Sequence, residues 1–195
     1  MDKDRIEAFS DGVIAVIITI TVLEMKVPHG PDFAALVPLL PVFLTYVLSF
    51  IYVGIYWNNH HHMFKLAPTV TGTILWANLH LLFWLSLLPF TTGWMGENHF
   101  ERWPTVVYGA NLLLCALAYS VLQACLIRHL GRDSLLARAM STDFKGKLSP
   151  VLYIAGIVTA ATVSAPAGLV FFVVVALMWL IPDRRIERAL ENREQ

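Results

Sequence analysis

Charged residues are scarce in this chain. Asp, Glu, Lys and Arg make up 14% of the 195 residues and hydrophobic residues 57%, whereas a soluble domain is roughly a quarter charged. The mean hydropathy is +0.63. This composition excludes an ordinary soluble domain and indicates an integral membrane protein. The formal net charge is zero, so the total charge does not point to an acidic or basic partner, and we expect no nucleic acid.

Cysteine is equally scarce. Cys115 and Cys125 are the only two, and both fall in one expected helix. At about 1.5 Å per residue their Cα atoms lie roughly 15 Å apart, whereas a disulfide needs Cα atoms within about 7 Å. We therefore expect two free thiols with no redox or metal role, and no cofactor.

The common nucleotide and metalloprotease signatures are missing. The chain contains no Walker loop, no Gly-x-Gly-x-x-Gly and no His-Glu-x-x-His. The first apolar stretch is not followed by a small-residue cleavage site, so we expect it to remain in the mature protein. No paired nucleophile or spaced ligand set is present either, and we expect no enzymatic activity.

Three adjacent histidines, His60, His61 and His62, are the most conspicuous polar cluster. Neighbouring residues on a helix point in different directions, and metal-binding pairs prefer a spacing of four. A structural or interfacial role is therefore favoured over a metal site, with one histidine bonded to Asp11 or Arg5. A pH-sensing role is the weaker alternative.

Uncharged stretches divide the chain into segments that can be compared with the roughly 20 residues of a membrane span. The first is short, and it spans only if residues 5–11 enter the helix. The third is expected to cover about residues 69–92. Prolines mark the start of the second, and a turn at Ser164–Gly168 divides the last in two. The stretches lie between these pairs of charges: Asp11 and Glu24, Asp32 and Lys65, Lys65 and Glu97, Arg102 and Arg128, Lys147 and Asp183.

Six spans with both termini in the cytoplasm best fit the charges. This arrangement places every Lys and Arg except Lys26 and Arg102 on the cytoplasmic side, as the positive-inside rule requires. The sequence therefore predicts an all-α membrane domain over residues 1–182, with residues 183–195 as a short, amphipathic cytoplasmic tail.

The first span carries an apolar stripe. On a wheel turning 100° per residue, one face collects Gly12, Val16, Thr19, Ile20 and Leu23. Such a stripe lines a narrow, dewetting pore or, as for any apolar helix, packs against another helix or lipid. Asp11 lies about 140° from Val16.

Asp11 needs a partner, because an intramembrane carboxylate faces the bundle interior and is paired. Candidates are Arg5 and the polar residues at the cytoplasmic ends of the second and third spans, which are residues 57–62, Asn78 and His80. We assign the tryptophans near span ends, Trp57 included, to anchoring and packing.

Arg5, Phe9, Ser10 and Asp11 form the pattern Arg-x-x-x-Phe-Ser-Asp at the start of the first span. This pattern resembles the signature of the transmembrane protein 175 family, which comprises lysosomal potassium channels and bacterial relatives. The similarity extends over the whole chain. It includes the segments Gly12–Ala15, Thr19–Glu24, Trp57–His61 and Asn78–Leu79.

The resemblance implies a potassium-permeable channel in the inner membrane of a bacterium. A chain with one six-span repeat resembles the bacterial members, which form homotetramers in the lipid bilayer. The first helix of each subunit would line the pore without a Thr-Val-Gly-Tyr-Gly filter, through Val16, Thr19, Ile20 and Leu23. The signature residues would hold that helix in place, with His60, His61 and Asn78 as partners.

One alternative function stays open at this point, a secondary transporter of small cations or solutes. Transporters usually show internal repeats and interrupted helices near the midplane, and neither is evident in the sequence. Where the family has a bulkier isoleucine or leucine, this chain has Val16. The narrowest point of the pore is therefore open, with Leu23 as the tighter candidate.

Overall fold

The computed structural model describes residues 3–23, 25–140 and 143–180, and every regular element within these ranges is helical. The predicted tail, residues 183–195, lies outside the described residues. One 3-10 helix and eight α-helices follow in this order: α1 (Asp4–Leu23), η1 (Phe33–Leu39), α2 (Leu40–Lys65), α3 (Gly72–Ser86), α4 (Leu88–Glu97), α5 (Arg102–Leu130), α6 (Leu135–Met140), α7 (Phe144–Thr162) and α8 (Ala165–Leu180).

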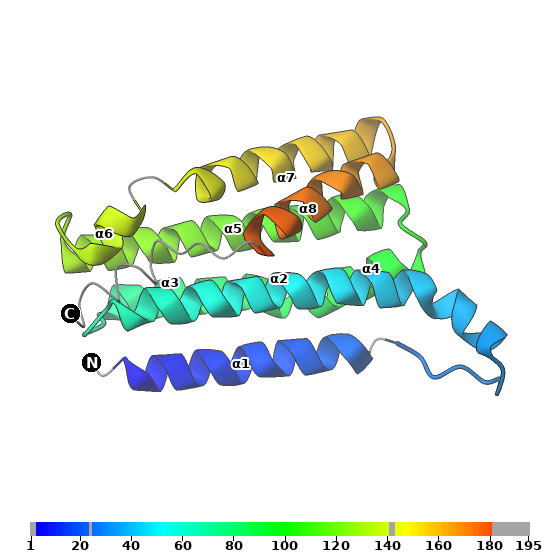
Figure 1. Ribbon diagram of the computed structural model, residues 1–195, viewed down its shortest axis with the longest axis horizontal. Coiled ribbons are helices and arrows are strands. Elements are labelled where there is room, and N and C mark those ends of the chain that lie inside the picture. The colour runs from blue at the N-terminus through cyan, green and yellow to red at the C-terminus, as the bar shows by residue number, and fades with distance from the viewer. Residues whose placement is uncertain (1–2, 24, 141–142, 181–195) are drawn as a thin grey trace.

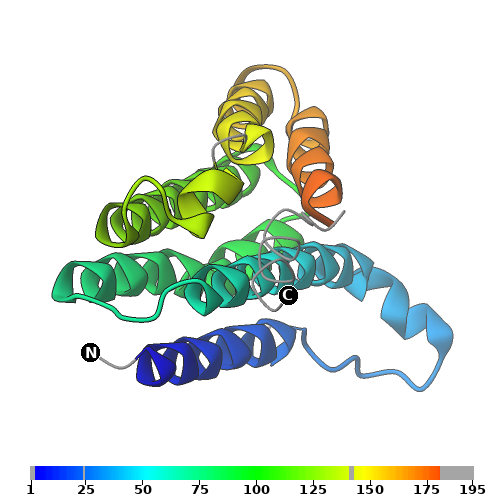
Figure 2. The ribbon, with the colours of Figure 1, turned by 60° about the vertical axis from the view of Figure 1, so that its left-hand side comes forward.

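The long helices run nearly parallel to one axis in three layers (Figures 1 and 2). α1 forms one outer layer and packs against α2, α3 and α4. These three helices form the middle layer, and α5, α7 and α8 form the other outer layer. α1 therefore has one side on the bundle and one side without cover from this chain.

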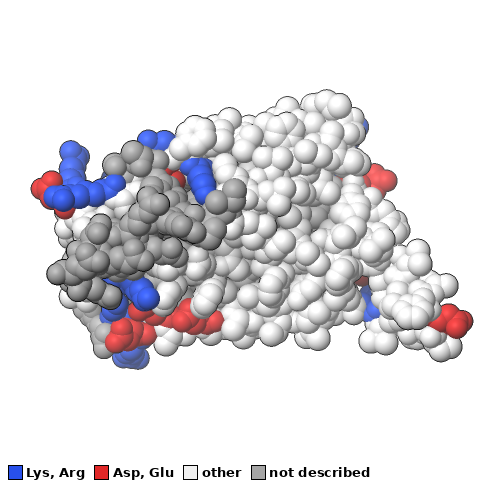
Figure 3. All heavy atoms as spheres, viewed as in Figure 1, with Lys and Arg blue, Asp and Glu red and all other residues white. Residues whose placement is uncertain are grey.

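The distribution of charge matches a membrane protein. In Figure 3 the charged side chains gather at the two ends of the long axis, and the middle of this face carries none. Among the described residues, four stretches are long and apolar enough to cross a membrane: Asp4–Leu23, Phe33–Lys65, Gly72–Glu97 and Arg102–Leu130. α8 is a shorter apolar helix. The chain is thus an all-α, multi-pass membrane protein.

The third stretch is interrupted, which the sequence analysis did not predict. α3 ends at Ser86 and α4 begins at Leu88, with Pro89 in its first turn. Proline has no N–H to donate to a carbonyl four residues earlier, so a break falls there. The two pieces together cover residues 72–97 rather than the predicted 69–92.

The last uncharged stretch forms two helices, as the turn signal indicated, but the turn is shorter than predicted. The hydroxyl oxygen of Ser164 accepts the N–H of Ala167 at 3.3 Å and caps α8. Pro166 then lies in the first turn of the helix, where its missing N–H costs nothing. Residues 165–168 therefore begin α8 instead of forming the loop.

Small residues bring α5, α7 and α8 close together. The ring of Phe172 lies against Gly109 of α5 and Gly156 of α7, where a Cβ atom would overlap it. At Gly168, a Cβ atom would lie 2.6 Å from the carbonyl oxygen of Gly156 and 2.8 Å from the backbone nitrogen of Ala160. Close approach through small residues is the usual packing mode of membrane helices.

We expect Gly168→Ala to lower the stability of the purified protein, because the new methyl group meets backbone atoms of α7 that cannot rotate away. Overpacking of this kind costs about 1–3 kcal/mol, measurable as a lower unfolding temperature in detergent. The control is Gly54→Ala, where a Cβ atom meets nothing within 4 Å. Equal destabilisation by both substitutions would contradict the proposed packing.

Candidate functional site

α1 has a buried face and an exposed face. The buried face consists of Ile6, Ser10, Ile14, Ile17 and Thr21. The exposed face includes the predicted stripe, Gly12, Val16, Thr19, Ile20 and Leu23. With about 100° of rotation per residue, the centres of these two sets lie more than 120° apart around the helix. The packing of the chain therefore leaves the predicted stripe uncovered.

The large apolar residues of this stripe are among the exposed residues of the molecule. Val16 is 53% exposed, Ile20 43% and Leu23 76%. Thr19 is the one hydroxyl between them, and its O–H donates to the carbonyl oxygens of Ala15 at 3.1 Å and Val16 at 3.0 Å. Thr19 satisfies its donor within the helix, so its oxygen can face outward only as an acceptor.

A buried polar chain holds the opposite face. The Asn78 side-chain nitrogen of α3 donates to the Ser10 hydroxyl oxygen at 2.8 Å. The Asn78 carbonyl oxygen is 2.8 Å from Nε2 of His60 in α2. Because that oxygen can only accept, Nε2 of His60 carries the proton. All three side chains are at least 98% buried, and a single amide thus joins three helices.

Asp11 is bonded to a residue that the sequence analysis assigned to anchoring. The indole N–H of Trp57 donates to Oδ1 of Asp11 at 2.9 Å, whereas the analysis favoured a histidine or Arg5 for a direct bond. Trp57 belongs to the candidate segment 57–62, but it was not singled out because a tryptophan near a span end fits an interfacial belt equally well. The signal that could have identified Trp57 is its indole N–H, a donor on the second span that needs an acceptor such as the Asp11 carboxylate on the first.

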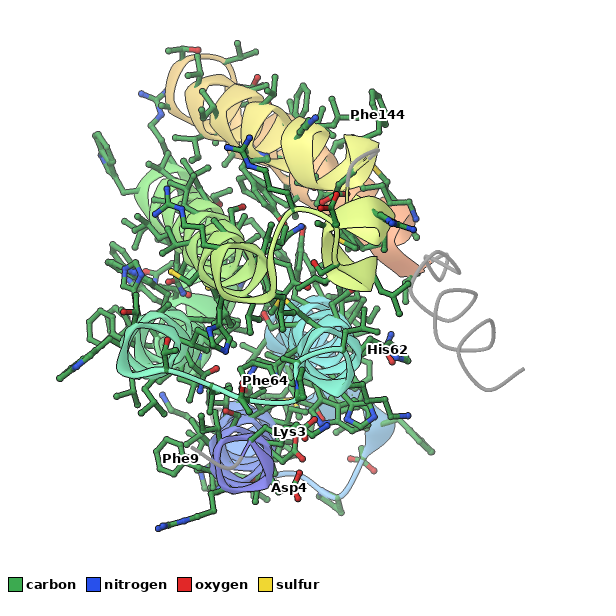
Figure 4. All side chains as sticks on the ribbon, turned by 90° about the vertical axis from the view of Figure 1, so that its left-hand side faces the viewer. Lys3, Asp4, Phe9, His62, Phe64 and Phe144 are labelled. Carbon is green, nitrogen blue, oxygen red and sulfur yellow. The ribbon has the colours of Figure 1, made fainter. Side chains whose placement is uncertain are left out.

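Arg5 and Phe9 lie on the exposed side of α1. Arg5 is exposed and makes no hydrogen bond or ion pair within the described residues. Phe9 is 54% exposed and projects away from the bundle in Figure 4, whereas Phe64 lies between helices. Within the described residues, the signature bonds to other helices through the side chains of Ser10 and Asp11.

The adjacent histidines have different partners. His60 belongs to the buried chain, whereas Nδ1 of His61 is 3.8 Å from Oε1 of Glu7. The ring of His61 also stacks on that of Trp57, with centroids 6.2 Å apart. No group of three His, Cys, Asp or Glu side chains within the described residues is arranged to hold a metal ion. The two neighbouring histidines of α2 therefore face different helices, His60 towards α3 and His61 towards α1.

A groove of about 820 Å³ lies between α1 and α4. One wall carries Phe9, Val16 and Ile20, and the other carries Phe90 and Trp94. The exposed stripe therefore continues into a concave, mainly apolar surface.

Several known proteins are similar to this chain in sequence. The family model of the endosomal/lysosomal potassium channel TMEM175 matches residues 5–89. A potassium channel of Chryseobacterium sp. (strain P1-3) is 53% identical over 98% of this chain and 100% of its own length. A potassium channel of Streptomyces collinus is 34% identical over 62% of this chain and 63% of its own length.

A solved structure agrees over almost the whole chain. The crystal structure of a lysosomal potassium-selective channel TMEM175 homolog from Chamaesiphon minutus superposes with a TM-score of 0.81 at 27% identity. The match covers 93% of this chain and 97% of that one. These proteins are channels and not enzymes, as expected for this chain. The full-length relative and the shared fold together show that the chain belongs to the TMEM175 family of membrane ion channels.

Proposed function

We propose that the chain forms a potassium-permeable cation channel in the bacterial plasma membrane, as a homotetramer with α1 of each subunit facing a central pore. One observation carries the proposal: Val16, Ile20 and Leu23 are exposed on α1, while its opposite face is held by buried hydrogen bonds. Four copies related by closed rotational symmetry would bring these stripes together. The names of the relatives support potassium as the ion.

An apolar pore lining explains how such a channel would gate. Side chains of Val16, Ile20 and Leu23 offer no oxygen ligands, so a narrow ring of them controls conduction through dewetting. At 1.5 Å per residue, Val16 and Ile20 lie about 6 Å apart along the axis, and Leu23 lies about 10 Å from Val16. Thr19 contributes a hydroxyl layer between them. Leucine is larger than valine, and we assign the tightest ring to Leu23.

The signature residues would set the rotation of α1 and would not themselves conduct. Turning a helix by one residue moves its faces by about 100°. Such a turn would remove Ser10 from Asn78 and Asp11 from Trp57, which now contact at 2.8 Å and 2.9 Å. We include His60, His61 and Asn78 as the partners that hold this bracket, and add Trp57 to them.

Arg5 has a separate place in the proposal. On the wheel it falls within about 20° of Val16, and it is exposed at the end of α1 where the helix begins. Arg5 would therefore lie with Phe9 at the cytoplasmic mouth of the pore instead of tying α1 to α2 or α3.

Six spans with both termini in the cytoplasm remain the topology we propose for residues 1–182. Lys3, Arg5 and Lys65 lie at the end of the bundle where α1 begins. The last turn of α5 and the described residues between α5 and α7 add further cations at that end, Arg128, Arg132 and Arg138. Lys26 and Arg102 lie at the other end, as a positive cytoplasmic side requires.

The groove between α1 and α4 supports assembly. Its walls expose Phe9, Phe90 and Trp94 beside the stripe. Because head-to-tail contacts generate closed rings when the rotation closes, we propose that a neighbouring subunit fills this groove in the tetramer.

The direct test is ion flux through the purified protein in liposomes. With a potassium gradient we expect flux well above that of protein-free vesicles, continuing until the gradient has dissipated. Saturable uptake that requires a second, coupled gradient would instead indicate a transporter. Cross-linked oligomers should have the size of four chains, and a monomeric conducting species would contradict the tetramer.

We expect Leu23→Ala to change the conductance and the potassium-to-sodium permeability ratio, because removing three side-chain carbons per subunit widens the proposed constriction. The measurement is the reversal potential in planar bilayers under mixed ionic conditions. Leu177→Ala is the matched control, since Leu177 is also exposed, at 57%, but lies on α8. Unchanged permeation by Leu23→Ala would remove Leu23 from the pore.

We expect Asn78→Leu to destabilise the protein and its tetramer more than it changes selectivity. The substitution leaves the buried Ser10 and His60 without partners, and each unsatisfied group costs about 1–3 kcal/mol. Unfolding temperature, native gels and reversal potential measure the three effects. Asn58→Ala, at an exposed position of α2, should leave all three unchanged. A selectivity change with intact assembly would place Asn78 in the permeation path.

A further inference from the structure

A second concave site lies away from α1. A cavity of about 210 Å³ is enclosed by α2, α5, α6, α7 and α8, and α1 contributes none of its described lining residues. It runs from Tyr52, near the middle of α2, to Asp143 and Lys147 at the start of α7. This start of α7 lies at the same end of the bundle as the start of α1. The cavity therefore reaches from the membrane interior to the proposed cytoplasmic surface.

Aromatic rings form much of the wall. Five of them come from four different helices: Tyr52, Tyr56, Tyr119, Tyr153 and Trp179. The rings of Tyr56 and Tyr119 meet edge to face with centroids 6.0 Å apart, and those of Tyr52 and Tyr153 are tilted at 6.3 Å. The faces of such rings carry partial negative charge and attract cations, most strongly at tryptophan.

Trp179 already receives a cation from this protein. The Nζ atom of Lys145 lies 5.8 Å from the centroid of its ring. The indole N–H of Trp179 is fixed by donating to the hydroxyl oxygen of Ser149 at 2.9 Å. The ring is thus held in one orientation, with the Lys145 ammonium beside it.

Three polar side chains of the cavity can accept hydrogen bonds from a ligand. Asp143 is 8% exposed, and its Oδ1 accepts the N–H of Gly146 at 3.0 Å. Asn59 donates its Nδ2 to the Ile55 carbonyl at 2.8 Å, which leaves its side-chain oxygen to accept. The Tyr56 hydroxyl makes no hydrogen bond within the described residues, although Tyr56 is 92% buried. Two cations of the described residues adjoin these acceptors: Lys147, which lines the cavity and is exposed, and Lys145, which lies over the Trp179 ring.

We propose that this cavity binds a small organic ammonium ion, a protonated alkylamine or arylalkylamine. The apolar body would lie among the tyrosine rings, and the ammonium N–H groups would donate to Asp143, Tyr56 or Asn59. A cavity of 150 Å³ in another protein holds benzene, so about 210 Å³ leaves space for a ring with a short amine chain. The site is separate from the proposed pore, and it does not depend on the chain conducting ions.

The test uses a pair of ligands with the same shape and opposite charge. Phenethylammonium is the probe and 3-phenylpropanoate is the comparison, both titrated into the full-length protein in lipid nanodiscs with calorimetric detection. Saturable binding of the cation, at least about tenfold tighter than the anion, is the expected result. Equal or tighter binding of the anion would give control of the site to Lys147 and overturn the proposal, as would no saturable binding of the cation.

Two variants locate the binding in the cavity. Asp143→Asn keeps an oxygen for the N–H of Gly146 but removes the charge, and we expect about a tenfold loss of affinity for phenethylammonium. Asp133→Asn, in the exposed loop at the same end and outside the lining, should bind as the unaltered protein does. Unchanged affinity in Asp143→Asn would overturn the assignment.

Ala116→Phe provides a check that does not depend on charge. Ala116 lines the cavity, and a phenyl group there would occupy the space of the ligand and abolish binding. Persistent binding by this variant would place the amine in the lipid or at another surface and overturn the proposal. Potassium flux through the same preparations reports on the pore independently, so failure of either proposal can be recognised without the other.

Discussion

The Asn78 amide is the interaction on which the orientation of α1 depends. In a membrane, the hydrophobic effect does not distinguish one face of an apolar helix from another, because lipid tails are as apolar as Leu or Ile. The Ser10, Asn78 and His60 side chains have no water to bond to at their depth, and each finds its partner only when the helices have one relative rotation. The buried polar chain therefore decides which residues of α1 remain outside.

The rest of the bundle is held by shape more than by polarity. Gly109, Gly156 and Gly168 let α5, α7 and α8 approach closely around the ring of Phe172. Such contacts fix distances between helices, whereas the hydrogen bonds at Asn78 fix a rotation. The two devices act in different layers. The close packing of α7 and α8 on α5 is compatible with the aromatic cavity that these helices line together with α2.

Much of this architecture could be predicted because charge in a membrane protein is confined to its ends. The uncharged stretches anticipated α1, α2 and α5. The wheel placed Gly12, Val16, Thr19, Ile20 and Leu23 on one face but did not decide whether that face lines a pore or packs against a helix or lipid. Trp57 was one of several candidate partners of Asp11, and the sequence could not select it, because an indole near a span end serves an interface and a carboxylate equally well. The position of Arg5 was missed because a motif groups residues by sequence, while a helix separates them by about 100° per step.

The two ends of α1 are held unequally, and this matters for a pore whose constriction lies along the helix. At the end where α1 begins, the hydrogen bond of Ser10 is fully buried, and a buried hydrogen bond is electrostatically stronger than one in water. At the other end, the chain after α1 is tied to α4 by an ion pair between Lys26 and Glu97, 2.7 Å apart and well exposed. Exposed pairs contribute only about 0–1 kcal/mol. In the proposed channel, Leu23 therefore lies beyond Thr21, the last buried residue of α1, and next to the segment tied by this exposed pair. Movement there would alter the ring of leucines while leaving the Asn78 chain intact, which separates the element that fixes the pore helix from the element that opens it.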